Sequence, residues 1–279
     1  MLATLGDLVE DIVVRLDGPI NDASDTPARI SRRRGGSAAN VAARSAAAGH
    51  PTRFLGQVGD DPAGRALTDE LAASGVDVSF VRRSGSTGTI VALVDPSGER
   101  SMLTDRRACD DLADPDPHWL DGVHVLHVPF YSLATGSTAT TATTVIEWAH
   151  GRGIDVAIDL SSSAVLAQHG VRAVRELLDA LAPSVVFANA DEARVVGVDG
   201  PVGRALTVVK HGAADAVVHR PDGTSMRVPV PPIAPPQDTT GAGDAFAAGF
   251  LVSGRWGDDP VAACRSGHIA AAELFRSRP

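Results

Sequence analysis

Apolar runs bounded by turn residues alternate along the chain with segments whose apolar positions are three and four residues apart. The runs lie at 52–56, 123–128, 154–158, 185–188, 206–209 and 216–219. The segments with helical spacing lie at 61–74, 136–151, 170–181 and 258–275. Strands that alternate with helices are typical of a mostly parallel sheet flanked by helices. The pattern therefore predicts an α/β fold with a doubly wound sheet.

Two segments break this alternation. At about 12–34 and 78–104, strand-like runs are joined by turns, such as Asp95-Pro96-Ser97-Gly98, with no helix between them. Antiparallel pairing of the two segments predicts a small sheet that stands off the main one. Further along, the proline-rich segment 229–236 predicts an extended, stiff stretch of chain.

The amino-acid composition indicates which kinds of binding partner and which cellular compartment to expect. The net charge is −9 with scattered acidic residues, and the one basic cluster, Arg32-Arg33-Arg34, is too short for a polyanion patch. The two cysteines, Cys109 and Cys264, make no disulfide framework, and no apolar stretch has the length needed to span a bilayer. We therefore expect a soluble cytoplasmic protein that binds neither nucleic acid nor membrane.

The strongest candidate for a chemical site is the segment Asp238-Thr239-Thr240-Gly241-Ala242-Gly243-Asp244. Glycines at 241 and 243 permit backbone conformations that other residues avoid and turn N–H groups toward one point. Apolar residues at helical spacing follow, which places the glycines at a helix N-terminus that favours an anion such as phosphate. Asp244 then lies in the first turn. We expect it to keep a low pKa and to accept the proton of a hydroxyl that attacks a γ-phosphate. The alternative is a tight turn whose aspartate only complements the helix dipole.

This segment and a second one, Gly35-Gly36-Ser37-Ala38-Ala39-Asn40, resemble the two signatures of the ribokinase-like (PfkB) carbohydrate kinases. Other landmarks of that family follow in its order along almost the whole chain, among them Gly56–Asp61, Gly98–Arg100 and Asn189–Glu192. The resemblance implies one ribokinase-like kinase domain over residues 1–279. It also implies that the small sheet is a lid over the sugar site and a dimer contact, so that a homodimer is expected.

The resemblance further implies an ATP-dependent kinase with Mg²⁺ that phosphorylates a hydroxyl of a small sugar or sugar acid. Gly241, Ala242 and Gly243 would form the anion hole and Asp244 would be the base. The sugar would be bound by residues near the start of the chain, namely Asp11, Gly35, Gly36 and Asn40.

The nucleotide end is implied by residues in the second half of the chain. Asn189 and Glu192 resemble the element that positions Mg²⁺, through water, although their spacing also fits a helix cap with a capping box. Lys210 and Gly212 resemble the strand and turn that border the adenine. The glycine that the family has three residues after Gly212 is Asp215 here. For Lys210 itself, which could reach a phosphate, the sequence favours the alternative of an exposed lysine at a strand end.

The family often holds a monovalent cation, usually K⁺, next to the anion hole. Asp238 and Thr240 match part of that site, but the chain stops at Pro279, where its remaining ligands are expected. K⁺ is therefore a weak expectation from sequence.

Two other functions stay open. A nucleoside kinase of the same family needs an apolar slot for the base, which Phe130-Tyr131 would provide in a chain with 4% aromatic residues. A sugar-binding regulator that lost the chemistry is the non-enzymatic alternative, and the intact Asp244 and glycines count against it. Arg106 and Arg107 either hold the carboxylate of an acidic sugar or contribute surface charge.

Overall fold

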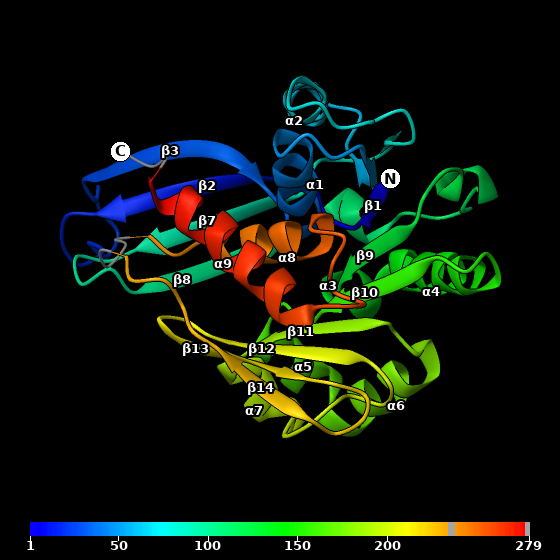
Figure 1. The fold of residues 1–279 in the computed structure, drawn as a ribbon. Helices are drawn as coiled ribbons and strands as arrows, with labels where there is room; N and C mark the ends of the chain where they lie inside the picture. The colour runs from blue at the N-terminus through cyan, green and yellow to red at the C-terminus, as the bar shows by residue number, and fades with distance from the viewer. Residues whose placement is uncertain (234–237, 277–279) are drawn as a thin grey trace.

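An eight-stranded sheet forms the centre of the computed structural model, which describes residues 1–233 and 238–276 (Figure 1). The strand order is β14-β13-β12-β11-β10-β9-β1-β4, and the six strands from β12 to β4 are parallel. The strands are β1 (Leu2–Leu5), β4 (Thr52–Leu55), β9 (Val125–Pro129), β10 (Asp155–Asp159), β11 (Val185–Asn189), β12 (Leu206–His211), β13 (Ala214–His219) and β14 (Ser225–Val228). The predicted mostly parallel sheet is confirmed, and each predicted strand lies within one or two residues of an observed one.

Helices cover both faces of this central sheet (Figure 1). Along β11, Val186 and Ala188 are buried against one set of helices, whereas Val185 and Phe187 are buried against the other. This alternation is what a strand covered on both faces requires. The first face is covered mainly by α4 (Gly136–Gly151), α6 (Val171–Leu181) and α7 (Ala190–Val196), and the second by α1 (Ser37–Ala47), α8 (Ala242–Val252) and α9 (Pro260–Arg276).

The predicted helices are all present. Those expected at 61–74, 136–151, 170–181 and 258–275 are α2 (Pro62–Ala73), α4, α6 and α9. The periodicity did not single out α1 or the short helices α3 (Tyr131–Ala134) and α5 (Ser163–His169). Two 3₁₀ helices, at Arg107–Asp110 and Pro117–Leu120, and a two-stranded pair, β5 (Gln57–Val58) with β6 (Arg82–Arg83), complete the connections.

A four-stranded sheet, hereafter the second sheet, stands beside the central one (Figure 1). Its order is β3-β2-β7-β8, with β2 (Val9–Leu16), β3 (Ala28–Gly35), β7 (Thr89–Val94) and β8 (Arg100–Asp105). The two hairpins β2–β3 and β7–β8 are antiparallel, but β2 and β7 pair in parallel. The predicted antiparallel pairing between the two segments was therefore wrong, because the turn signals specify each hairpin and carry no information on how the hairpins meet.

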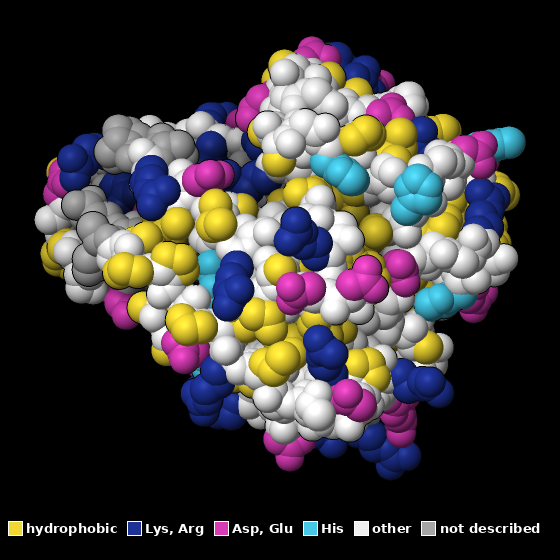
Figure 2. Space-filling view, in the orientation of Figure 1, with side chains coloured by type: hydrophobic (Ala, Val, Ile, Leu, Met, Phe, Trp, Pro, Cys, Tyr) yellow, Lys and Arg dark blue, Asp and Glu magenta, His cyan; other side chains and the backbone are white. Residues whose placement is uncertain are grey.

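Charged side chains of both signs are spread over the face drawn in Figure 2, as the composition predicted. Within residues 1–233 and 238–276, no helix combines the length and the apolar character needed to cross a bilayer. Both cysteines are free and buried. Of the proline-rich segment, residues 234–236 lie outside the described residues.

Candidate active site

The start of α1 and the start of α8 meet at Asp244. The Ser37 hydroxyl donates to Oδ1 of Asp244 at 2.7 Å, and the Asn40 amide donates to Oδ2 at 2.9 Å. Asp244 lies in the first turn of α8, as the sequence predicted. The two motifs that carry the family resemblance are thus in direct contact, although more than 200 residues separate them.

The predicted low pKa of Asp244 is wrong in direction. Burial raises the pKa of this carboxyl above its ordinary value, and the charge of Asp159 adds to the increase. The hydrogen bonds from Ser37 and Asn40 and the charge of Lys210 oppose it. The helix N-terminus alone suggested a low value, but the tertiary structure removes the carboxylate from water, and that loss of solvation outweighs the favourable contacts.

The two glycines of the motif have different roles. Gly241 precedes α8 with φ +75°, in the left-handed region that glycine adopts most easily. Gly243 lies inside the helix, so the expectation of an unusual backbone was right for Gly241 and wrong for Gly243. A Cβ added at Gly243 would lie 3.4 Å from Nζ of Lys210, so this glycine leaves space above the lysine. The Ala242 N–H donates to the Thr239 carbonyl at 3.1 Å and closes the turn before the helix.

Lys210 lies below this turn in a charged cluster at the carboxyl edge of the sheet. Its Nζ is 2.9 Å from Oδ2 of Asp159, and the two side chains are 15% and 8% exposed. The ammonium also lies over the rings of Phe187 and Phe246. Burial acts to lower the pKa of Lys210, but the carboxylates of Asp159 and Glu192 hold it above its ordinary value. The alternative of an exposed lysine at a strand end is therefore wrong.

Asn189 and Glu192 form the complete capping box that their spacing allowed. The Asn189 side chain accepts from the N–H groups of Asp191 and Glu192, and the Glu192 carboxylate accepts from the Asn189 N–H at 2.7 Å. Asn189 is the register partner of Lys210 in the sheet, so the box borders the charged cluster. Burial, followed by the charge of Asp159, raises the pKa of Glu192 to about 7. The metal-positioning role of the pair stays a prediction.

Gly35 and Gly36, in the motif predicted to bind the sugar, allow Asp11 and Asp7 to lie close to their backbone. A Cβ at Gly35 would lie 2.2 Å from Oδ1 of Asp11, and one at Gly36 would lie 2.1 Å from the Asp7 carbonyl. Gly36 also has φ +99°. Burial raises the pKa of Asp11, against the charge of Arg33. The contacts of both glycines are thus with the protein itself, and their predicted contact with an acceptor hydroxyl stays a prediction.

Asn40 is engaged at both ends of its amide. Its Oδ1 accepts from Nη1 of Arg34 at 3.2 Å, while its Nδ2 donates to Asp244. Arg34 in turn lies 3.3 Å from Glu70 of α2. The second motif therefore holds the first one in place, whatever its part in binding a sugar.

Arg106 is a structural arginine. It pairs with Asp7 at 2.6 Å and with Asp110 at 2.7 Å, and it donates to the Tyr131 carbonyl. Its side chain is largely buried between these partners, so surface charge does not describe it, and its contact with the carboxylate of an acidic sugar stays a prediction. Arg107 is exposed and pairs with Asp105, which fits surface charge. Of the predicted aromatic slot, Phe130 is fully buried in the core.

Asp238 and Thr240, predicted as cation ligands, face arginines of the second sheet. Arg100 donates to Oδ1 of Asp238 at 2.7 Å and to the Thr240 hydroxyl. Arg33 lies 3.6 Å from Oδ2 of Asp238. Gly212 forms the exposed turn between β12 and β13 with φ +63°, and its predicted place beside the adenine stays a prediction.

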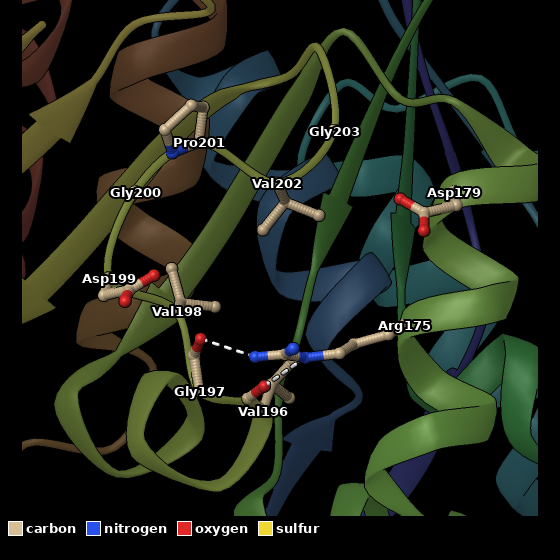
Figure 3. Close-up of a pocket in the computed structure, with 10 residues that line it drawn as sticks. All are labelled: Arg175, Asp179, Val196, Gly197, Val198, Asp199, Gly200, Pro201, Val202 and Gly203. Carbon is tan, nitrogen blue, oxygen red and sulfur yellow. Dashed lines mark hydrogen bonds between the residues drawn. The ribbon is translucent and has the colours of Figure 1, made fainter. Parts of the chain in front are cut away.

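A cavity of about 220 Å³ lies elsewhere, between α6 and the loop that follows α7 (Figure 3). Arg175 crosses it and donates to the carbonyls of Val196 and Gly197 at 2.7 Å each. These carbonyls end α7 and have no partner within the helix, so Arg175 caps it. This helix end lies near the start of β12, at the opposite edge of the sheet from Asp244.

Sequence reasoning missed several residues that hold the site together. Asp159 is the first polar residue after an apolar run, a position that marks the carboxyl edge of a parallel sheet and was available as a signal. Ser37 stands between the two predicted residues Gly36 and Asn40. Arg34 and Arg100 were not singled out as site residues: Arg34 bonds Asn40 and Glu70, and Arg100, although part of the Gly98–Arg100 landmark, acts on residues about 140 positions further along the chain. Among residues 1–233 and 238–276, no group of three or more His, Cys, Asp and Glu side chains is arranged to hold a metal ion.

Comparison with known proteins gives the same family as the two motifs. Residues 1–278 match the family model of the pfkB family carbohydrate kinases. The chain is 32% identical over 254 residues to an ATP-dependent ribose-1-phosphate kinase of Halopiger xanaduensis, with 87% of this chain and 81% of that protein covered. It is also 32% identical over 265 residues to a fructokinase of Klebsiella pneumoniae, with 88% and 82% covered.

Among solved structures, the adenosine kinase from Sinorhizobium meliloti superposes with a TM-score of 0.85 and 27% identity, covering 100% of this chain and 95% of that one. An Arabidopsis thaliana ribokinase complexed with ribose and ATP superposes with a TM-score of 0.81 at 22% identity, covering 100% and 93%. The latter likeness concerns the fold alone.

Proposed function

Because the chain belongs to the pfkB family of carbohydrate kinases, we propose that it transfers the γ-phosphate of ATP to a hydroxyl of a small sugar or sugar acid, with Asp244 as general base. The observation that carries the proposal is the meeting of Asp244 with Ser37 and Asn40. This contact joins the anion-binding turn to the motif predicted to bind the acceptor.

The chemistry is an in-line transfer. The acceptor oxygen forms a bond to the γ-phosphorus while the bond from that phosphorus to the bridging oxygen of ADP breaks, and the hydroxyl proton passes to Asp244. A carboxyl whose pKa is raised by burial is a stronger proton acceptor than an exposed one. The donors Ser37 and Asn40 and the charge of Lys210 favour its ionised form, so that it is ready to accept the proton.

In this proposal the first turn of α8 binds the phosphate. The N–H groups of Gly241, Ala242 and Gly243 lie at the positive end of the helix, where charge on the transferred group is stabilised, and the Ala242 N–H is shared with the Thr239 carbonyl. The positive charge of Lys210 lies directly below this turn.

Mg²⁺ would be positioned, through water, by Asn189 and Glu192. Their oxygens are of the kind that this hard cation prefers, and the ATP phosphates would complete its ligands. When bound, the ion neutralises charge on the triphosphate. On the same resemblance we assign Lys210 and Gly212 to the nucleotide side, and Asp11, Gly35, Gly36 and Asn40 to the acceptor side.

We further infer a cytoplasmic homodimer that joins through the second sheet, with that sheet as the lid over the acceptor. Its two edge strands expose large apolar side chains, Ile30 on β3 and Leu103 on β8, each more than half exposed. Apolar residues in such positions favour burial against a partner.

A nucleoside acceptor is the second candidate, and the 27% identity to an adenosine kinase supports it. Against it, Phe130 belongs to the core, which leaves Tyr131 as the remaining aromatic side chain of the predicted slot. A non-catalytic regulator has no such support, because Asp244 and the residues that hold it are all in place.

An ATP-consumption screen tests the proposal. ADP release is measured with a panel of sugars, sugar phosphates, sugar acids and nucleosides, and Asp244→Asn, purified in the same way, is the control for contaminating kinases. We expect one acceptor class to stimulate ADP release in the wild type only. Stimulation by no class above the level of the control would contradict the proposal.

A further inference from the structure

A monovalent cation does not fit beside residues 238–240, which precede the proposed anion hole, because Arg100 already contacts their side chains. Arg100, the first residue of β8, donates to Oδ1 of Asp238 at 2.7 Å and also to the Thr240 hydroxyl. These are the two side chains that the family resemblance assigns to K⁺. A guanidinium therefore stands where the resemblance implies an inorganic cation.

The second oxygen of Asp238 also faces an arginine. Arg33 of β3 lies 3.6 Å from Oδ2, so that both oxygens of one carboxylate have a guanidinium nearby. The Asp238 side chain is 17% exposed and that of Arg100 is 26% exposed, so solvent screens the pair only in part. Burial acts to raise the pKa of Asp238, but the hydrogen bonds from Thr240 and Arg100 hold it well below its usual range.

A small cavity of about 20 Å³ adjoins this contact. Its charged and polar lining consists of Arg15, Arg33, Arg100, Asp238 and Thr240, and the rest is apolar. Three guanidinium groups against one carboxylate repel a cation, and apolar walls offer it no oxygen ligands. The residues present thus do not fit K⁺.

We infer that the guanidinium of Arg100 serves as the cation beside the anion hole, so that the protein needs no monovalent cation for activity. The inference rests on the proposed phosphoryl transfer. Oδ1 of Asp238 also accepts from the Thr240 N–H at 2.8 Å, immediately before Gly241. By fixing this carboxylate, Arg100 orients the turn that would bind phosphate, which makes it a positioning residue.

The positive charge of Arg100 differs from that of a dissolved ion in how it is supplied. A dissolved ion acts from solvent at a concentration set by the medium, whereas Arg100 is carried by the second sheet and acts where that sheet contacts residues 238–240. The position of the second sheet and the order of the anion hole are therefore linked through the ion pairs that Arg100 and Arg33 form with Asp238.

The first test uses the wild type. Its rate with an acceptor from the screen, and its affinity for Mg·ATP by calorimetry, are measured in KCl and in tetramethylammonium chloride of equal ionic strength. We expect both quantities to agree between the salts. Activation or tighter binding in K⁺ by about fivefold or more, the lower end of typical coupling between sites, would overturn the inference. If no acceptor is phosphorylated in either salt, the proposed function fails, and the inference is decided on ATP affinity alone.

The second test removes the charge. Arg100→Ala is expected to lose about tenfold or more in kcat, because a partly buried carboxylate loses a charged partner. Millimolar guanidinium is expected to restore part of the loss. Arg29→Ala, which removes an exposed arginine of β3 paired with Asp17, is the matched control and should keep its activity. Full activity of Arg100→Ala, or a loss in a folded variant that neither guanidinium nor K⁺ reverses, would contradict the inference. Circular dichroism establishes the fold, and the wild-type test stands if the variant does not fold.

Discussion

The side-chain amide of Asn40 donates a hydrogen bond of 2.9 Å to the carboxylate of Asp244, which lies 204 residues further along the chain. The same amide accepts from Arg34, so its orientation is fixed from both sides. The position of the proposed base therefore depends on a residue of the opposite motif.

Replacement of Asn40 by alanine should lower kcat by about ten- to a hundredfold, because Asp244 loses one of two donors and Arg34 loses the amide oxygen and keeps Glu70 as a side-chain acceptor. If Asn40 also binds the sugar, the KM of the acceptor rises and that of ATP does not. Ser37→Ala removes the other donor and should lower kcat without a change in acceptor KM. A lower melting temperature with unchanged kinetic constants would limit Asn40 to a structural role.

Asp244→Asn should reduce kcat by roughly 10²–10⁴, the usual scale for a general base, and leave ATP affinity nearly unchanged. The substitution keeps the size of the side chain but removes the proton acceptor. Steady-state kinetics and calorimetric ATP binding check this. Asp191→Asn changes an exposed aspartate in the first turn of α7 and should remain active. Near-wild-type turnover of Asp244→Asn would rule out the assignment.

The buried carboxyl of Glu192 makes stability depend on pH. Its pKa is raised to about 7, whereas in the unfolded chain a glutamate has a pKa of about 4.3. The folded protein holds the proton more tightly, so this contribution to stability is present below about pH 4 and is lost as pH rises through about 7. Glu192→Gln carries no charge at any pH. We expect its free energy of unfolding, relative to wild type, to increase by up to about 3 kcal/mol between pH 5 and pH 8.

Urea denaturation at the two pH values measures this difference. Glu176→Gln alters an exposed glutamate of α6 that pairs with Arg172, and its difference from wild type should not change in the same way. An equal difference from wild type at both pH values for Glu192→Gln would show that the raised pKa has no energetic consequence.

Lys210→Met should destabilise the protein by about 3–5 kcal/mol, because Asp159 keeps its charge in a nearly buried position without a counterion. Adding Asp159→Asn removes that charge, and the double variant should recover part of the loss. Thermal and urea denaturation of the four proteins form a double-mutant cycle. Additive effects of the two substitutions would mean that the pair contributes no coupling.

Gly36→Ala should cost about 1–3 kcal/mol of stability and disturb the start of α1. The residue has φ +99°, and an added Cβ would lie 2.1 Å from the Asp7 carbonyl. Gly98→Ala is the matched control, since Gly98 has φ +90° but open space around the added atom. The larger loss of melting temperature at Gly36 measures the close approach separately from the backbone strain. Equal losses at both positions would contradict the packing argument.

The apolar runs of the sequence predicted most of the central sheet, because a strand that is covered on both faces, such as β11, consists of consecutive apolar residues. The periodicity did not single out α1, whose buried positions are mostly alanines, among them Ala38, Ala39 and Ala42, and not large apolar residues. The parallel pairing of β2 with β7 was missed because it joins hairpins that are distant in sequence.

In the site, as in the fold, features that depend on local sequence were predicted and features that depend on distant segments were not. Gly241 and the helix after it specify the turn and the place of Asp244, and these were predictable. The raised pKa of Asp244, the buried position of Lys210 and the contact of Arg100 with Asp238 each depend on residues brought together from distant segments. Local sequence carries no information on such long-range desolvation and pairing.

Helices α8 and α9 come last in the described chain, yet they cover the face of the central sheet that contains Phe187, Val208 and Val218. During translation this face has, of the described helices, only α1 as cover until the C-terminal part of the chain has left the ribosome. A nascent chain that stops before Asp238 therefore exposes apolar strands, which favour aggregation and capture by chaperones. It also lacks Asp244 and the proposed anion-binding turn. The same two helices complete the core and supply the proposed base, so incomplete chains cannot act as kinases.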